Sequence, residues 1–220
     1  MNFACNLLQR QTGYFLQNNE SKKIKNFFNC KNPQDALAEF FYTIANLYSS
    51  ENDYRLSNFY LKISTFLNKK FIPNEALLAE NFYYQKKNKE SKKIYYSLKS
   101  IGDAYSWYSS KNIATILLHE KGKEYSIRSL EKDFNLLSIT NFEHYFELAN
   151  FYKDNEYYNE SIKYYSLALK KIKKNHPLIS KILYRRGTSF ERLGEWENAE
   201  KDLLESLKIS PDQAHVLNYL

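Results

Sequence analysis

Small side chains recur along the chain at a nearly constant spacing, within stretches whose apolar residues follow the period of an α-helix. The first set lies 34, 35, 35 and 38 residues apart and consists of Ala45, Ala79, Ala114, Ala149 and Gly187. A second small residue follows each of them twelve positions later: Ser57, Ser91, Ser126, Ser161 and Ala199. A period in the thirties predicts one supersecondary unit that is copied and stacked. We therefore expect one domain whose core runs from copy to copy.

Each copy contains two apolar stretches with helical spacing, such as Phe41, Ile44, Ala45 and Tyr48 in the first copy. Polar or glycine-containing breaks separate the two stretches, and further breaks separate the copies. The breaks between copies contain proline or helix-capping residues, and the expected N-caps are Asp103, Asn141 and Asp212.

These breaks define the predicted organisation of the chain. Five helix pairs are expected at residues 38–71, 72–106, 107–141, 142–179 and 180–213. Residues 1–37 are expected to form a degenerate helical segment or partial repeat, and residues 213–220 the start of a truncated sixth repeat. The chain is thus expected to be all-α. It is either a whole array or a fragment of a longer one.

The last copy has the most detailed pattern, formed by Leu183, Gly187, Phe190, Gly194, Trp196, Ala199, Leu203, Ser206 and Pro211. It resembles the tetratricopeptide repeat (TPR), and the chain is similar to long bacterial, alphaproteobacterial-like TPR proteins. The resemblance implies a right-handed α-solenoid superhelix of antiparallel helix pairs. The resemblance also implies that both sets of small residues, together with Pro211, are the positions at which the repeats pack. Serine replaces alanine at four second positions, and we expect each buried hydroxyl to bond a carbonyl one turn earlier.

Composition adds little to this picture. The chain is 43% hydrophobic and 17% aromatic, which is enough for a buried core. Its net charge of +7 would suit nucleic acid or anionic lipid. Abundant Lys together with Asn, Ile and Tyr is also what AT-rich codons produce, so nucleic-acid binding is the weakest functional alternative.

No motif for catalysis or for cofactor or metal binding stands out. The four histidines lie at least 25 residues apart, and Cys5 and Cys30 are the only cysteines. The glycines are isolated, so no phosphate-binding loop is expected. We predict that the protein is not an enzyme and uses no cofactor, metal or small-molecule substrate.

The sequence has neither the pattern of a signal peptide nor an apolar stretch long enough to span a membrane. This predicts a cytoplasmic protein, or a periplasmic or envelope-associated one if the chain is an N-terminally incomplete fragment. Apolar Leu217 and Leu220 suggest self-association through the C-terminal end.

In TPR arrays the first helix of each pair lines a concave groove, so the resemblance implies a peptide-binding wall. Its predicted residues are Tyr42, Asn46, Glu80, Tyr83, Tyr84, Tyr108, Lys111, Thr115, Phe146, Asn150, Lys153, Lys181, Tyr184, Arg185 and Thr188. Exposed aromatic side chains beside amides suit peptide capture. The alternative for any one of these tyrosines is packing between adjacent repeats.

Co-chaperone TPR domains hold a peptide carboxylate with five polar residues, and the corresponding residues here are Lys111, Thr115, Glu147, Lys181 and Arg185. Glu147 would repel a carboxylate, so an acidic peptide that contacts only the three cations is favoured. The predicted function is a noncatalytic protein-interaction scaffold that holds a peptide or helical segment. The alternative is a structural spacer or self-assembling segment of a larger envelope-associated protein.

Overall fold

The computed structural model describes residues 31–211 continuously, together with residues 12, 13, 15, 16, 22, 27–29 and 216. These residues form helices, turns and bends, with no strand among them. Most of the predicted N-terminal segment and nearly all of the predicted sixth repeat, including Asp212, lie outside the described residues. The chain forms two compact units, Met1–Ser129 and Leu130–Leu220, and each is described by itself.

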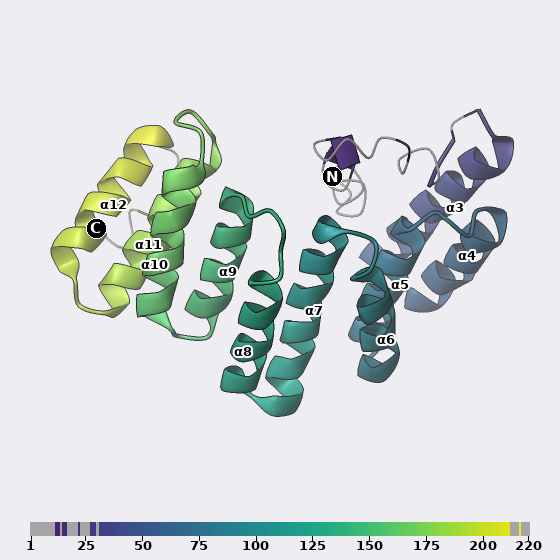
Figure 1. Ribbon diagram of the computed structural model, residues 1–220, viewed down its shortest axis with the longest axis horizontal. Helices are drawn as coiled ribbons and strands as arrows, with labels where there is room; N and C mark the ends of the chain where they lie inside the picture. Colours follow the sequence, from purple (N-terminus) through teal and green to yellow (C-terminus); the bar gives the residue numbers. More distant parts are fainter. Residues whose placement is uncertain are drawn as a thin grey trace. The chain divides into compact units, whose positions relative to one another are not determined.

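The helices follow one another as antiparallel pairs, in which the first is helix A and the second helix B (Figure 1). The A helices are α3 (Pro33–Ser50), α5 (Pro73–Tyr84), α7 (Asp103–Lys121), α9 (Phe142–Asp154) and α11 (Leu178–Arg192). The B helices are α4 (Tyr54–Leu67), α6 (Asn88–Leu98), α8 (Lys123–Phe134), α10 (Tyr158–Lys171) and α12 (Trp196–Ile209). The all-α class predicted from the apolar periodicity is thereby confirmed.

Local chemistry accounts for where several helices begin. Helix α3 begins at Pro33, ahead of the predicted start at residue 38, because the Asn32 side chain accepts a hydrogen bond from the Gln34 amide and proline suits the first helical position. Asn141 caps α9 as predicted, in a capping box with His144. The expectation for Asp103 was wrong by one residue, since Gly102 is the N-cap of α7 and Asp103 is its first helical residue.

In the unit of residues 1–129, the paired small residues are fully buried where helices A and B meet. Ala45, Ala79 and Ala114 on the A helices are 0% exposed, as are Ser57, Ser91 and Ser126 on the B helices. Aromatic rings fill the space beside them, for example Tyr42, which meets Phe71 edge to face at 5.4 Å between ring centroids. The paired small residues thus allow close helix crossings, and the larger side chains beside them form the core.

Two of the buried serines in this unit bond across the helix pair, so the expected bond to a carbonyl one turn earlier was wrong for Ser91 and Ser126. The Ser91 hydroxyl donates to the carbonyl of Ala79 at 2.8 Å, and that of Ser126 donates to the carbonyl of Ala114 at 2.6 Å. The small alanine lets the two backbones approach closely enough for this contact. Ser161 does bond to a preceding carbonyl, that of Tyr158, at 2.8 Å.

In the unit of residues 130–220, Gly187 lies where α11 and α12 approach closely. A Cβ atom there would lie 3.1 Å from Cγ of Leu203 and 3.2 Å from the Ala199 carbonyl oxygen. A side chain at this position would therefore press on α12. The adjoining core between α9, α10 and α11 is built from Phe146, Ala149, Tyr165, Ala168, Ile172 and Ile182.

Candidate functional site

Helices α9 and α11 bring two predicted groove residues, Asn150 and Arg185, together in the second unit. The side-chain oxygen of Asn150 accepts hydrogen bonds from Nη1 of Arg185 at 3.0 Å and from the hydroxyl of Tyr165 at 2.7 Å. Nη1 of Arg185 also lies 3.4 Å from Oδ1 of Asp154. The guanidinium is thus held in a defined place, with 29% of its side chain still exposed.

Lys153 lies beside this cluster. Its Nζ donates to the hydroxyl of Thr188 and lies 5.9 Å from the centroid of the Tyr184 ring. Burial, followed by the nearby positive charge of Arg185, lowers the pKa of Lys153 to about 8. A cation in this position is favoured less than in water, and an anionic group bound nearby would favour its charged form.

A cavity of about 430 Å³ adjoins these residues at α11. It is lined by Pro177, Leu178, Ser180, Lys181, Tyr184, Arg185 and Ser210. Among these described lining residues the charged side chains are Lys181 and Arg185, and both are positive. The cavity therefore suits a carboxylate or another anionic group that also contacts the Tyr184 ring.

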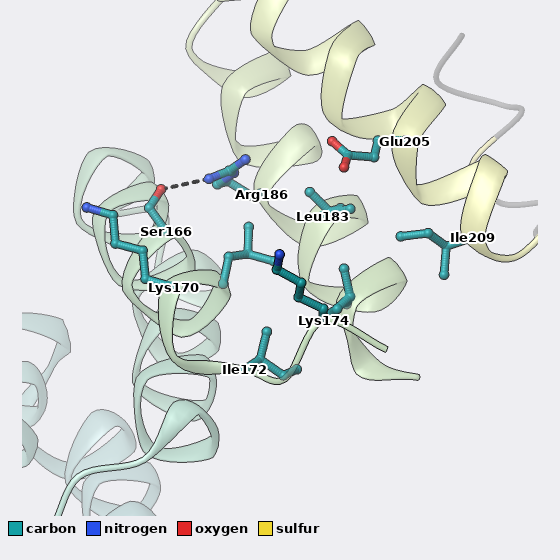
Figure 2. Close-up of a pocket in the computed structure, with 10 residues that line it drawn as sticks. Ser166, Lys170, Ile172, Lys174, Leu183, Arg186, Glu205 and Ile209 are labelled. Atoms are coloured by element: carbon teal, nitrogen blue, oxygen red, sulfur yellow. Dashed lines mark hydrogen bonds between the residues drawn. The ribbon is translucent and has the colours of Figure 1, made fainter. Parts of the chain in front are cut away.

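A second cavity, of about 570 Å³, lies between α10, α11 and α12 and was missed by the sequence interpretation (Figure 2). Apolar residues such as Ile172 and Leu183 line it, together with the ion-paired Arg186, whose Nη1 donates to Ser166 at 2.9 Å. Helical periodicity could have shown these apolar positions, but not that space remains between them. Half of the lining residues are apolar, and the charged side chains besides Arg186 are Lys170, Lys174 and Glu205.

In the first unit, predicted groove residues form a partly buried cluster on α5 and α7. The Tyr108 hydroxyl donates to Oε1 of Glu80 at 2.6 Å. Burial raises the pKa of Glu80, and the hydrogen bond from Tyr108 partly offsets this effect. Nearby, Tyr84 is 57% exposed and stacks on Tyr54 with 5.7 Å between ring centroids. Tyr84 is therefore a surface residue.

Several predicted groove side chains lie in the core. Tyr42, Tyr108, Phe146 and Thr188 are at most 9% exposed. Little of these four side chains is therefore available to a bound peptide. The other predicted A-helix positions are half-buried or exposed: Asn46, Glu80, Tyr83, Tyr84, Lys111, Thr115, Asn150, Lys153, Lys181, Tyr184 and Arg185.

The repeat-packing residues follow the prediction more closely. All ten small residues of the two sets are buried, whereas Pro211, which follows the end of α12, is exposed. Pro211 can still prevent continuation of the helix, since that role needs only its fixed backbone.

Among the described residues, no group of three or more His, Cys, Asp or Glu side chains is arranged to hold a metal ion. None of the described helices is both long and apolar enough to cross a membrane.

The stacked helix pairs, with small residues at each crossing, define an α-helical repeat protein. Residues 143–170 and 180–213 match the tetratricopeptide repeat family, so α9–α10 and α11–α12 are tetratricopeptide repeats. The resemblance to TPRs is thus confirmed for these two copies. No curated protein matches the chain in sequence.

Solved structures of TPR proteins share the fold. PilF of Pseudomonas aeruginosa aligns with a TM-score of 0.53 and 15% identity, over 98% of this chain and 96% of PilF. MamA from Desulfovibrio magneticus RS-1 aligns with a TM-score of 0.54 and 13% identity, over 83% and 98% of the two chains. YrrB, described as a TPR protein with an unusual peptide-binding site, aligns with a TM-score of 0.51 and 16% identity, over 86% and 93%.

Proposed function

We propose that the protein is a noncatalytic scaffold that binds an acidic segment of a partner protein on the α9–α11 face. The observation that carries the proposal is the cavity at α11, whose charged lining residues are Lys181 and Arg185. A TPR fold suits such a role because function in repeat proteins resides on the extended surface of the stack.

The state of the cations supports an anionic partner. Arg185 is already oriented by Asn150 and Asp154, so binding would cost little side-chain entropy. The pKa of Lys153 is lowered to about 8 by burial and by Arg185. A bound carboxylate would relieve the repulsion between these two cations, and the Tyr184 ring offers apolar contact area beside them.

The comparison with YrrB adds a precedent of the same fold, since that protein is described as having a peptide-binding site. A true carboxylate clamp is not part of the proposal. Lys111 belongs to the other unit, and Glu147 on α9 would oppose a carboxylate at the position where the clamp needs a donor.

The test uses a short fluorescein-labelled peptide of Glu, Tyr and Leu, and the same peptide with Gln in place of Glu. Fluorescence anisotropy should show tighter binding of the Glu peptide, and Arg185→Gln and Lys181→Gln should each weaken it by about tenfold. Lys201→Gln on α12 is the matched control, since it removes the same charge from an exposed position.

Equal affinity for the two peptides would contradict the proposal. So would an equal loss in Lys201→Gln, because that result would mean attraction to the overall positive charge of the protein rather than to this face.

A further inference from the structure

The first helix pair carries an apolar surface with the spacing of a helix-packing interface. On α3, Leu37, Phe40, Ile44 and Leu47 follow one another at intervals of three, four and three residues. On α4 the same intervals separate Leu56, Phe59, Ile63 and Phe66. Such heptad spacing is typical of helices that pack lengthwise against other helices. We call these eight residues the heptad face.

Most of the heptad face is exposed. The exposed fractions are 48% for Leu37, 57% for Phe40, 60% for Leu47, 38% for Leu56, 55% for Phe59 and 82% for Phe66. With about 200 Å² for each large side chain, these fractions correspond to roughly 700 Å² of apolar surface. Contiguous apolar patches of this size on a soluble protein mark interaction sites.

Ring contacts join the two stripes into one surface. Phe40 meets Phe41 edge to face, Phe41 stacks on Tyr60, and Phe59 meets Tyr60 edge to face at 5.4 Å. Tyr48 also stacks on Tyr60, with 5.5 Å between ring centroids. The exposed stripes therefore stand on either side of a packed aromatic floor, which gives the surface a fixed shape before any partner binds.

Helix α5 of the next pair packs on the other side of this helix pair. Ser49 bonds to Asn81 of α5 at 2.7 Å, and Tyr54 stacks on Tyr84. With 3.6 residues per turn, these positions face away from the heptad face. The next repeat therefore does not cover the apolar surface.

We propose that the heptad face binds the same face of a second copy of this chain, so that two helix pairs form a four-helix bundle. The surface is self-complementary, because both helices carry the same apolar spacing. Its size is close to the roughly 800 Å² that each partner buries in a standard interface. A twofold axis through such a surface gives a closed dimer.

The charged residues of the two helices do not decide how they pair. Arg55 and Lys62 border the heptad face on α4, whereas Asp35 and Glu39 lie on the far side of α3 from it. The dimer therefore rests on the apolar spacing and the size of the surface.

The experiment is sedimentation velocity of the full chain over a range of concentrations. The wild type should form a dimer that persists at high salt, because apolar burial drives it. Phe40→Glu and Phe59→Glu should each raise the dimer dissociation constant about thirtyfold or more. Tyr96→Glu on α6 is the control, since Tyr96 is 56% exposed and lies outside the heptad face. Circular dichroism identifies variants that have lost their helices.

Three results would overturn the proposal. The first is a wild type that stays monomeric at every concentration, and the second is a dimer that both folded variants retain. The third is flotation of the monomer with vesicles of phosphatidylcholine and phosphatidylserine that is lost in Phe40→Glu, which would make the heptad face a membrane-docking surface. A helical Phe40→Glu variant that is monomeric, beside a dimeric Tyr96→Glu, supports it.

Discussion

Arg186 and Asp202 form a two-pronged ion pair across the crossing of α11 and α12. Nε of Arg186 donates to Oδ2 of Asp202 at 2.6 Å, and Nη2 donates to Oδ1 at 2.8 Å. The Asp202 side chain is 4% exposed and that of Arg186 is 20% exposed. Arg186 directly precedes Gly187 in α11, and the Cβ of Asp202 lies 3.2 Å from where a Cβ at position 187 would lie. The ion pair therefore fixes the register at which α11 meets α12.

Removing one member of this pair should be costly, since it leaves the other charge without its partner. We expect Arg186→Met to lower the free energy of unfolding by about 3 kcal/mol, because the Asp202 carboxylate would remain buried. Chemical denaturation followed by circular dichroism measures the change. The double variant Arg186→Met with Asp202→Leu should recover much of the loss. If the double variant loses the sum of both single effects, the pair is not coupled.

Substitution of Gly187 tests the close approach itself. Alanine is the better helix former by about 1 kcal/mol, but its Cβ would press on the Ala199 carbonyl oxygen and Leu203 Cγ. We expect Gly187→Ala to be net destabilising by about 1 kcal/mol, and Gly187→Val by considerably more. Thermal unfolding measures both. A stabilised Gly187→Ala protein would show that α12 moves away freely.

The buried serines separate the role of size from that of the hydroxyl. Ser126→Ala removes the 2.6 Å hydrogen bond to the Ala114 carbonyl, which is worth about 1 kcal/mol. It also raises helix propensity and removes a polar hydroxyl from the core, and both of these effects are stabilising. We expect a change within about 0.5 kcal/mol. Ser126→Val should destabilise the unit by about 1–3 kcal/mol, since the added methyl groups meet α7. Equilibrium unfolding in urea distinguishes the two, and equal losses would mean that the hydroxyl matters most.

The sequence could predict the parts of the fold that depend on residue size and helical period. Ala45, Ser57 and their counterparts recur because each crossing needs two small residues, and that need is visible in the chain itself. The pairing of helices and the buried state of the small residues followed from it.

Side-chain orientation could not be predicted equally well. Tyr42 and Tyr108 occupy positions that line a groove in the family, yet both are buried here. Arg186 and Asp202 are charged residues on helices with many others, and only the crossing of α11 and α12 shows that these two meet in a buried site. The orientation of Arg185 by Asn150 likewise depends on how two helices pack, because the two residues lie 35 positions apart in the chain.

The lowered pKa of Lys153 predicts how stability varies with pH. Its folded-state pKa is about 8, below the ordinary value of 10.5, so between these two values the unfolded chain binds more protons than the folded one. The contribution of Lys153 is therefore destabilising at neutral pH, and stability should recover as the pH rises from about 8 to above 10. Lys153→Met should remove this contribution to the pH dependence, which urea denaturation at several pH values measures. Lys163→Met on the exposed surface of α10 is the control, and should leave the pH dependence as in the wild type. If Lys153→Met and the wild type respond identically to pH, the ammonium group is fully solvated and its proposed response to a bound carboxylate loses its basis.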